Sequence, residues 1–359
     1  MFNNEELVCL WFDYNGYTFS KLEKILQNFD TIDSVFDKNL LKSAFFEKDL
    51  EPIRNELLEL DKDKFIKRID DEFYKNNIGA VTYVSKNYPE KLKVISDPPL
   101  VLYTKGDQSL LNKKSISIVG TRSPSEYGKI VCEKFTKELS SAGLVTVSGL
   151  AYGIDTIAAE STLAVNGKTI AVLAGGLDSI YPAQNTNLAK RIEKNGLLIS
   201  EHKIGEKPAN FMFISRNRIV SALSLGTLII EAGKKSGTMA TARFAIEQSR
   251  ELFVVPGNIY SKTSEGTNNL IDEMPDTFTI SPERILFRLK IKKRQPQEKA
   301  VQVGIENNSI LTNLDNGEKS FDELSSLTGL KPSELSSELI KMEMFGLIKV
   351  GDDGLYYKL

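Results

Sequence analysis

The chain has 359 residues, which is long enough for two or three domains and at least one large hydrophobic core. Its 41% hydrophobic and 26% charged residues are typical of soluble globular proteins, and no apolar run reaches the roughly 18 residues of a membrane span. The start, MFNNEELVCLW, has no basic segment before an apolar stretch, so we expect no secretory signal and a cytoplasmic protein without membrane contact.

Two cysteines and one histidine do not predict a metal site. Cys9 and Cys132 both sit among apolar neighbours at helical spacing, so we expect buried thiols in a reducing compartment.

Charge is unevenly distributed, although the net charge of the chain is only −2. Residues 1–80 hold 11 basic and 17 acidic side chains, and residues 305–359 hold 5 and 10. The middle of the chain is therefore basic, and residues 284–304 alone contribute seven basic side chains against one acidic. This pattern fits a polyanion site in the middle of the chain. A lysine-rich solvated surface with a charged linker explains the same counts.

The first 80 residues have apolar side chains at helical spacing, for example in EELVCLWF and FSKLEKILQNF. These two segments flank a turn at Asn15–Gly16 and resemble a small hairpin of helices. We expect a helical domain over residues 1–80, of the SAM or helix-hairpin type. Such units often contact nucleic acid, but the acidic charge favours a packing or protein-contact role here.

Residues 81–283 begin with short extended pieces and then alternate strands with helices. The expected strands are residues 116–119, 144–147, 169–173, 197–200, 227–230 and 252–255. The expected helices between them are residues 127–141, 154–165, 185–194 and 239–248. Short apolar strands separated by helices predict an α/β fold: a Rossmann-type, doubly wound, mostly parallel sheet covered on both faces.

The remainder divides into a basic, proline-containing linker over residues 284–304 and a winged helix over residues 305–359. In the winged helix, residues 321–327 form the second helix, Pro332 opens the third, and residues 347–350 and 355–358 form the wing. The third helix carries Lys331 and Lys341 among glutamates, and the block has no arginine. This composition favours a protein-contact module, with weak DNA contact as the alternative.

Small residues and hydroxyls follow most of the predicted strands, where doubly wound sheets bind ligands. Arg122 follows the first strand with Ser123 and Ser125, Gly149 follows the second, and Ser236, Gly237 and Thr238 open a helix after the fifth. Free amides at a helix start bind phosphate, and a guanidinium adds a bidentate contact. The chain contains neither G-x-G-x-x-G nor G-x-x-x-x-G-K-[ST], so we expect no nucleotide cofactor.

Cations and aromatic side chains alternate in EKPANFMFISRNRIVSALS, residues 206–224. Lys207, Arg216 and Arg218 are suited to phosphates, and Phe211 can stack a base, as in proteins that bind single strands. In the alternative interpretation, Phe211 and Phe213 lie in the core at strand spacing and Arg216 pairs with Glu231. The spacing alone does not decide between the two.

Asp155, Asp178 and Glu231 are candidate catalytic carboxylates, but no nucleophile–base pair accompanies them. His202, the only histidine, follows a strand, and Asp155 and Asp178 fit helix caps better. We therefore do not expect an enzyme. The alternative is a nucleoside-monophosphate phosphoribohydrolase-like enzyme, because Gly226–Thr227 with Glu231 and Arg216 loosely resembles the site of cytokinin-activating phosphoribohydrolases.

Several segments over residues 88–271 together resemble the DNA-processing protein A family, also called DprA or Smf. They are YPEKLKVISDPPLVLYTKG, IVGTRSPSEYG, VSGLAYGID, TIAVLAGGLDSIYPAQN, SRNRIVSALS, IIEAGKKSGTMATARFAIEQSRELFVVPGN and TNNLI. Outside this range the similarity is one of layout, with a helical domain before the core and a winged helix after it.

The resemblance implies a cytoplasmic, dimeric protein without established catalytic activity. It would bind single-stranded DNA, protect it, and load the RecA recombinase during natural transformation in competent cells. By the same resemblance, Arg122 contacts phosphate, and the contacts before the R-N-R motif fall on Lys207 and Phe211. Arg216, Asn217 and Arg218 match R-N-R, and Ser236, Gly237 and Thr238 match S-G-[ST]. Neither the dimer surface nor the RecA surface follows from the sequence.

Overall fold

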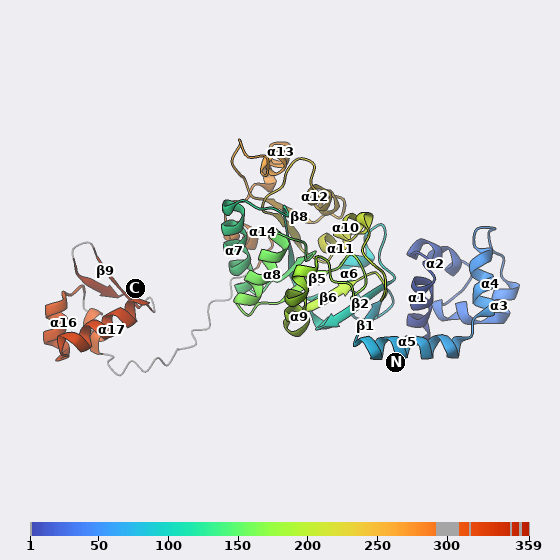
Figure 1. Cartoon of the computed structure of the whole chain (residues 1–359), viewed down its shortest axis with the longest axis horizontal. Coiled ribbons are helices and arrows are strands. Elements are labelled where there is room, and N and C mark those ends of the chain that lie inside the picture. The colour runs from blue at the N-terminus through green and yellow to red at the C-terminus, as the bar shows by residue number, and fades with distance from the viewer. Residues whose placement is uncertain (1, 292–308, 316, 345–346, 352–353, 359) are drawn as a thin grey trace. The chain divides into compact units, whose positions relative to one another are not determined.

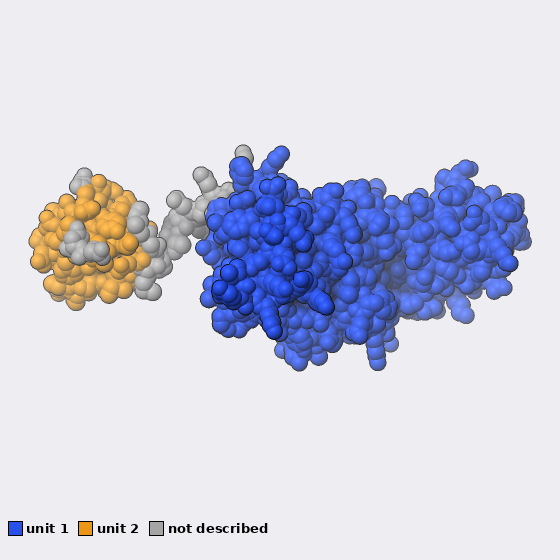
Figure 2. All heavy atoms as spheres, turned by 90° about the horizontal axis from the view of Figure 1, so that it is seen from above, with its two compact units in different colours: residues 1–294 blue, residues 295–359 orange. Residues whose placement is uncertain are grey.

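The computed structural model describes residues 2–291, 309–315, 317–344, 347–351 and 354–358. The chain forms two compact units, Met1–Arg294 and Gln295–Leu359 (Figure 2). Within the described residues, no helix is both long enough and apolar enough to cross a bilayer, and no cluster of side chains is suited to a metal ion.

The first unit begins with five α-helices and a 3₁₀ turn (Figure 1). They are α1 (Asn4–Tyr14), α2 (Phe19–Leu26), η1 (Ile32–Phe36), α3 (Lys38–Ser43), α4 (Glu51–Glu59) and α5 (Lys62–Asn76). Helix α1 is apolar on nearly all sides, and Leu7 to Phe12 are all buried. A helix that is hydrophobic all round belongs in a core. This region therefore packs around α1, and Cys9 is one of its buried residues.

An eight-stranded sheet follows, in the order β1-β2-β6-β5-β4-β3-β7-β8. Its strands are β1 (Gly79–Thr82), β2 (Val101–Gly106), β3 (Ser115–Val119), β4 (Val145–Ser148), β5 (Thr169–Val172), β6 (Leu197–Ser200), β7 (Gly226–Ile229) and β8 (Glu251–Val254). Strands β3 to β8 are parallel, as the alternation of strands and helices predicted. The sheet is mixed because β1 and β2 add antiparallel strands at the β6 edge, where the sequence showed only short extended pieces.

Helices cover both faces of this sheet (Figure 1). They are α6 (Glu90–Lys93), α7 (Glu126–Ser141), α8 (Ile154–Ala164), α9 (Thr186–Asn195), α10 (Asn210–Ser215), α11 (Asn217–Ala222), α12 (Gly237–Glu247), α13 (Glu265–Glu273) and α14 (Pro282–Arg288). Three 3₁₀ turns complete the unit: η2 (Gln108–Asn112), η3 (Ala183–Asn185) and η4 (Pro275–Thr277). Successive residues of a strand point to opposite faces of the sheet, so one strand contributes side chains to two hydrophobic cores. Thus Ile118 of β3 packs with Cys132 of α7, whereas Val119 packs in the cluster that holds Val220 of α11.

The N-terminal helices share a core with the antiparallel edge of the sheet. Tyr103 of β2 is buried in the same cluster as α1, and its hydroxyl donates to Asp13 at 2.5 Å. Lys203, after β6, donates to the carbonyl of Tyr14 at 2.9 Å. These contacts make residues 1–80 part of the same compact unit as the sheet.

Helix α14 runs into the segment that was expected to begin the linker. Ile285 and Leu286 are buried against the sheet, and Arg288 at the end of the helix pairs with Glu251. The apolar pair holds these residues in the first unit despite the basic charge around them. Of the expected linker, residues 292–304 lie outside the described residues.

The described part of the second unit contains three helices and a hairpin, as expected of a winged helix. They are α15 (Ser309–Leu314), α16 (Phe321–Thr328), α17 (Pro332–Met344), β9 (Ile348–Val350) and β10 (Tyr356–Lys358). Ser320 and Glu323 form a capping box at the start of α16, and Gly329 ends that helix in the left-handed region. In α17, Lys341 pairs with Glu338 at 2.6 Å.

Candidate nucleic-acid interface

The strand order reverses between β3 and β7, which places a topological switch point at their carboxyl ends. The turn after β3 is fixed there by two backbone hydrogen bonds. The amide of Thr121 donates to the carbonyl of Glu231 at 2.7 Å, and its carbonyl accepts from Ile154 at 3.2 Å. A Cβ on Gly120 would lie 2.5 Å from the side chain of Ile154, so only glycine fits. The turn leaves Arg122 exposed at the sheet edge.

A cavity of about 520 Å³ opens at this point, and we call it the switch-point crevice. It is lined by Val119, Gly120, Thr121, Arg122, Ala151, Asp155, Tyr181, Asn210, Phe213, Ile214, Arg216, Asn217, Ser236, Gly237, Thr238 and Thr241. The structure thus brings together six of the predicted binding residues: Arg122, Arg216, Asn217, Ser236, Gly237 and Thr238. Ser123, Ser125, Gly149, Lys207, Phe211 and Arg218 do not line it.

The start of α12 contributes backbone amides to the crevice. Ser236 is the N-cap residue of this 11-residue helix, but within the described part of the chain its side chain forms no cap hydrogen bond. The hydroxyl of Ser236 is buried and has no hydrogen-bond partner among the described residues. The first amides of a helix have no intrahelical acceptor, and the helix dipole makes this end positive. The S-G-T segment therefore offers unpaired donors to an anion.

Arg216 lies beneath the crevice and is only 4% exposed. Its guanidinium donates to the carbonyl of Gly149 at 2.5 Å and to the carbonyl of Val172. Burial lowers its pKa to about 10, and the nearby Asp155 carboxylate opposes that shift. The ion pair with Glu231, which the alternative interpretation of this segment required, is absent from the described contacts. Arg216 connects the end of β4 to the end of β5 through these two carbonyls. Because it also lines the crevice, its positive charge is available to attract a phosphate there.

Gly149, expected to contact phosphate, is engaged within the protein. Its amide donates to Asp155 at 2.9 Å, and its carbonyl accepts from Arg216. Burial raises the pKa of Asp155, which the charge of Arg216 and two backbone amides oppose. Asp155 thus holds the turn before α8, and it does not cap amides of its own helix. Asp178, the other expected cap, accepts from the amide of Gly205 at 3.0 Å.

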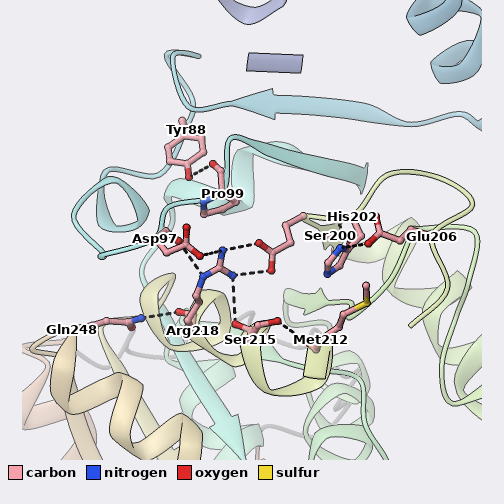
Figure 3. Close-up of polar contacts among 11 residues, drawn as sticks. Tyr88, Asp97, Pro99, Ser200, His202, Glu206, Met212, Ser215, Arg218 and Gln248 are labelled. Carbon is pink, nitrogen blue, oxygen red and sulfur yellow. Dashed lines mark hydrogen bonds and ion pairs between the residues drawn. The ribbon is translucent and has the colours of Figure 1, made fainter. Parts of the chain in front are cut away.

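Arg218 faces another part of the molecule (Figure 3). Its guanidinium forms a two-point ion pair with Glu201, at 2.7 and 2.6 Å, and approaches Asp97 at 3.3 Å. It lines a different cavity, of about 600 Å³, together with Asp13 and His202. The two arginines of R-N-R therefore separate: Arg216 supports the crevice, and Arg218 connects α11 to the end of β6.

The aromatic contact in the crevice comes from Phe213. Residues 210–215 form helix α10, so the strand spacing considered for Phe211 and Phe213 is wrong. Phe211 is 67% exposed and Lys207 is exposed, and neither lines the crevice. The ring of Phe213 lies 5.2 Å from that of Tyr181, and the Arg122 guanidinium lies 5.6 Å from the Phe213 centroid.

Ser125 is the N-cap residue of α7. Its hydroxyl accepts from the amide of Gly128 at 3.1 Å, and its own amide donates to Glu231 at 2.9 Å. Ser123 is exposed on the same turn. His202 follows β6, and its Nδ1 lies 3.0 Å from Oε1 of Glu206 (Figure 3).

Comparison with known protein families shows to which family this chain belongs. The model of the family described as DNA recombination-mediator protein A matches residues 79–290, more than half of the chain. The chain belongs to this family. A model of the DprA winged helix domain matches residues 294–354, which confirms the predicted module.

Relatives and solved structures agree with this membership. The DNA processing protein DprA of Bacillus subtilis is 43% identical over 220 residues, 59% of this chain and 74% of that protein. Protein Smf of Escherichia coli is 35% identical over 276 residues, 74% of this chain and 73% of that protein.

The X-ray structure of DprA from Streptococcus pneumoniae covers 80% of this chain and 98% of its own, with a TM-score of 0.67 and 33% identity. A Helicobacter pylori DprA structure, described for its single-stranded DNA binding mode, covers 59% of this chain and 95% of its own, with a TM-score of 0.54 and 34% identity.

In this member of the DNA recombination-mediator protein A family, sequence reasoning missed Tyr181 as a crevice residue. Tyr181 follows β5 at the edge where the other site residues gather, and that position was the available signal. Among the residues that the structure describes, Asp155 is the one carboxylate that lines the crevice, and no histidine lines it. Glu231 and Arg216, which the phosphoribohydrolase-like alternative requires in one site, line different cavities. Family membership supports a role in DNA processing and recombination.

Proposed function

We propose that this chain binds single-stranded DNA along the switch-point crevice. The observation that carries the proposal is the convergence of an exposed arginine, an aromatic pair and an uncapped helix start at one sheet edge. The family of DNA recombination mediators, and the single-stranded DNA binding described for the Helicobacter pylori protein, support the same ligand.

Each component has a physical task in this proposal. The Arg122 guanidinium and the first amides of α12 bind phosphate oxygens, with Ser236 and Thr238 beside them. The rings of Phe213 and Tyr181 stack an unpaired base, an interaction worth about 1–3 kcal/mol per base. Base pairs in duplex DNA are already stacked and leave no face free, so single strands are preferred. Phosphate contacts carry no sequence information, so we expect little dependence on sequence at these residues.

Further parts of the proposal rest on the resemblance to the family. The protein protects incoming single-stranded DNA and loads RecA recombinase in natural transformation, as a cytoplasmic homodimer without catalytic activity. Lys207 and Phe211 are exposed and extend the strand path beyond the crevice. The winged helix acts as a protein-contact module, which its Glu338–Lys341 pair and lack of arginine support.

The test is fluorescence anisotropy of the full chain with labelled single-stranded and duplex oligonucleotides at several salt concentrations. Affinity for the single strand falls as salt rises, because neutralised phosphates release counterions. Arg122→Ala weakens binding to all sequences similarly. Arg191→Ala is the matched control: Arg191 is 51% exposed on α9, toward the opposite edge of the sheet. Equal loss in both variants, or a preference for duplex, would refute the proposal.

A further inference from the structure

The β3–α7 turn that gives Arg122 to the crevice also gives residues to a second cavity. Ser125 and Tyr127 line this cavity of about 590 Å³, with Glu231, Asn258 and Ser261. Glu231 follows β7 and Asn258 follows β8, so this cavity also lies at the carboxyl ends of parallel strands. It belongs to the same edge of the sheet as the switch-point crevice.

Glu231 is a buried carboxylate without a cationic partner. It is 2% exposed, and it accepts hydrogen bonds from the amide of Ser125 at 2.9 Å and from the hydroxyl of Thr263. Among the described residues, no lysine, arginine or histidine pairs with it. Buried charges are usually paired or hydrogen-bonded, and a carboxylate has about four acceptor sites. Glu231 therefore retains acceptor capacity on a wall of the cavity, suited to a ligand with N–H donors.

Tyr127 and Pro256 give the cavity an apolar wall, and two exposed apolar side chains lie on the chain segment next to it. The hydroxyl of Tyr127 donates to the carbonyl of Pro256 at 2.8 Å, which fixes a ring that is 48% exposed. Ile259 and Tyr260 are 79% and 91% exposed on the segment between Asn258 and Ser261. Flat apolar surfaces beside a buried acceptor match the faces and the donor edge of a nucleobase.

We propose that this second cavity holds one base of the bound DNA strand and favours a base with an exocyclic amino group. The inference rests on the proposed function, because the strand in the crevice is what brings bases to this edge. Glu231 accepts from the N4 amino group of cytosine, whereas thymine presents the acceptor O4 at the same position. A free mononucleotide carries the same donor, so the experiment must separate the two sources.

The experiment compares oligo-dC with oligo-dT, two pyrimidine strands of equal length, on the full chain. We expect wild type to bind oligo-dC at least about fivefold more tightly, within what one charge-assisted hydrogen bond supports. Glu231→Gln brings the ratio to about one without weakening oligo-dT, because the new amide can donate to O4. Equal affinities in wild type overturn the inference and leave the proposed function standing. Failure of wild type to bind either strand instead refutes the proposed function.

Two further measurements, one with Tyr127 variants and one with free dCMP, cover the cases that the first comparison leaves open. If Glu231→Gln does not fold, Tyr127→Ala decides: loss of the preference for oligo-dC supports the site, and an unchanged ratio overturns it. Tyr127→Phe keeps the ring and is expected to keep the preference. Competition with dCMP identifies the source of the base. If dCMP displaces oligo-dC at equal nucleotide concentration, the cavity binds a free mononucleotide and the inference that it holds a base of the strand is wrong. If dCMP does not displace oligo-dC, the result supports the inference.

Discussion

The guanidinium of Arg122 lies over the ring of Phe213, 5.6 Å from its centroid. The same ring contacts Tyr181 with a centroid separation of 5.2 Å. These three side chains come from the turn after β3, from α10 and from the segment after β5. A cation and two rings therefore meet at one edge although they are far apart in the sequence. Under the proposed function, these rings stack a base and the cation binds its phosphate.

Phe213→Ala is expected to lower the affinity for single-stranded DNA by about fivefold or more, because one base loses a stacking partner. Phe211→Ala, at the exposed neighbour outside the crevice, has a smaller effect. Anisotropy titrations of both variants against the same oligonucleotide measure the difference. The larger loss at Phe211 would place the stacking platform outside the crevice and contradict the arrangement described here.

Gly149→Ala is expected to destabilise the protein by about 1–3 kcal/mol, the usual cost of overpacking a core. The added Cβ would lie 2.2 Å from the buried guanidinium of Arg216, which is held by two carbonyls. Gly237→Ala is the control, since none of the described residues has an atom within 4 Å of the Cβ that it would add. Urea unfolding of both variants provides the measurement. Unchanged stability of Gly149→Ala would show that the guanidinium can move aside.

The sequence predicted the parallel strands, because short apolar runs between helices are local signals, and the small residues after them indicated which edge of the sheet to examine for a candidate site. It also predicted that Arg122 and the S-G-T segment belong to one candidate site, and both line the switch-point crevice. The different roles of Arg216 and Arg218 depend on partners far away in the chain, Gly149 in one case and Glu201 in the other. Spacing within R-N-R carries no information on such contacts. The pairing of β1 with β2 and of β2 with β6 was not predicted, because these antiparallel pairings join segments that are not adjacent in the chain and have no local sequence signal.

Asp13 makes the stability of the protein depend on pH. Burial raises its pKa from 3.8 to about 7, against the hydrogen bond from Tyr103 and the charge of Lys203. The folded state thus favours the protonated carboxyl, and its contribution to stability is complete below about pH 4 and lost as the pH rises to about 7. At roughly 1.4 kcal/mol per pKa unit, the rise from 3.8 to about 7 corresponds to a loss of about 4 kcal/mol.

Asp13→Asn removes this loss, because the amide is neutral and its oxygen still accepts from Tyr103. We expect the variant to equal wild type near pH 4 and to exceed it in free energy of unfolding at pH 8, measured by urea titration at each pH. Asp30→Asn, at an exposed aspartate of the same helical region, controls for the loss of one charge. A constant difference between Asp13→Asn and wild type across this range would contradict the effect of burial.

Arg218→Ala is expected to reduce stability by about 2–4 kcal/mol and to leave the affinity of the folded protein for single-stranded DNA nearly unchanged. The substitution leaves the Glu201 carboxylate, only 16% exposed, without its ion-pair partner, which is costlier than losing the attraction alone. The double variant with Glu201→Gln should recover part of the stability, because the unpaired charge is then absent. Urea unfolding of the single and double variants, with anisotropy on each, separates the two properties. A large loss of DNA affinity with normal stability would instead assign Arg218 to the strand, and the R-N-R motif would then act as one binding unit.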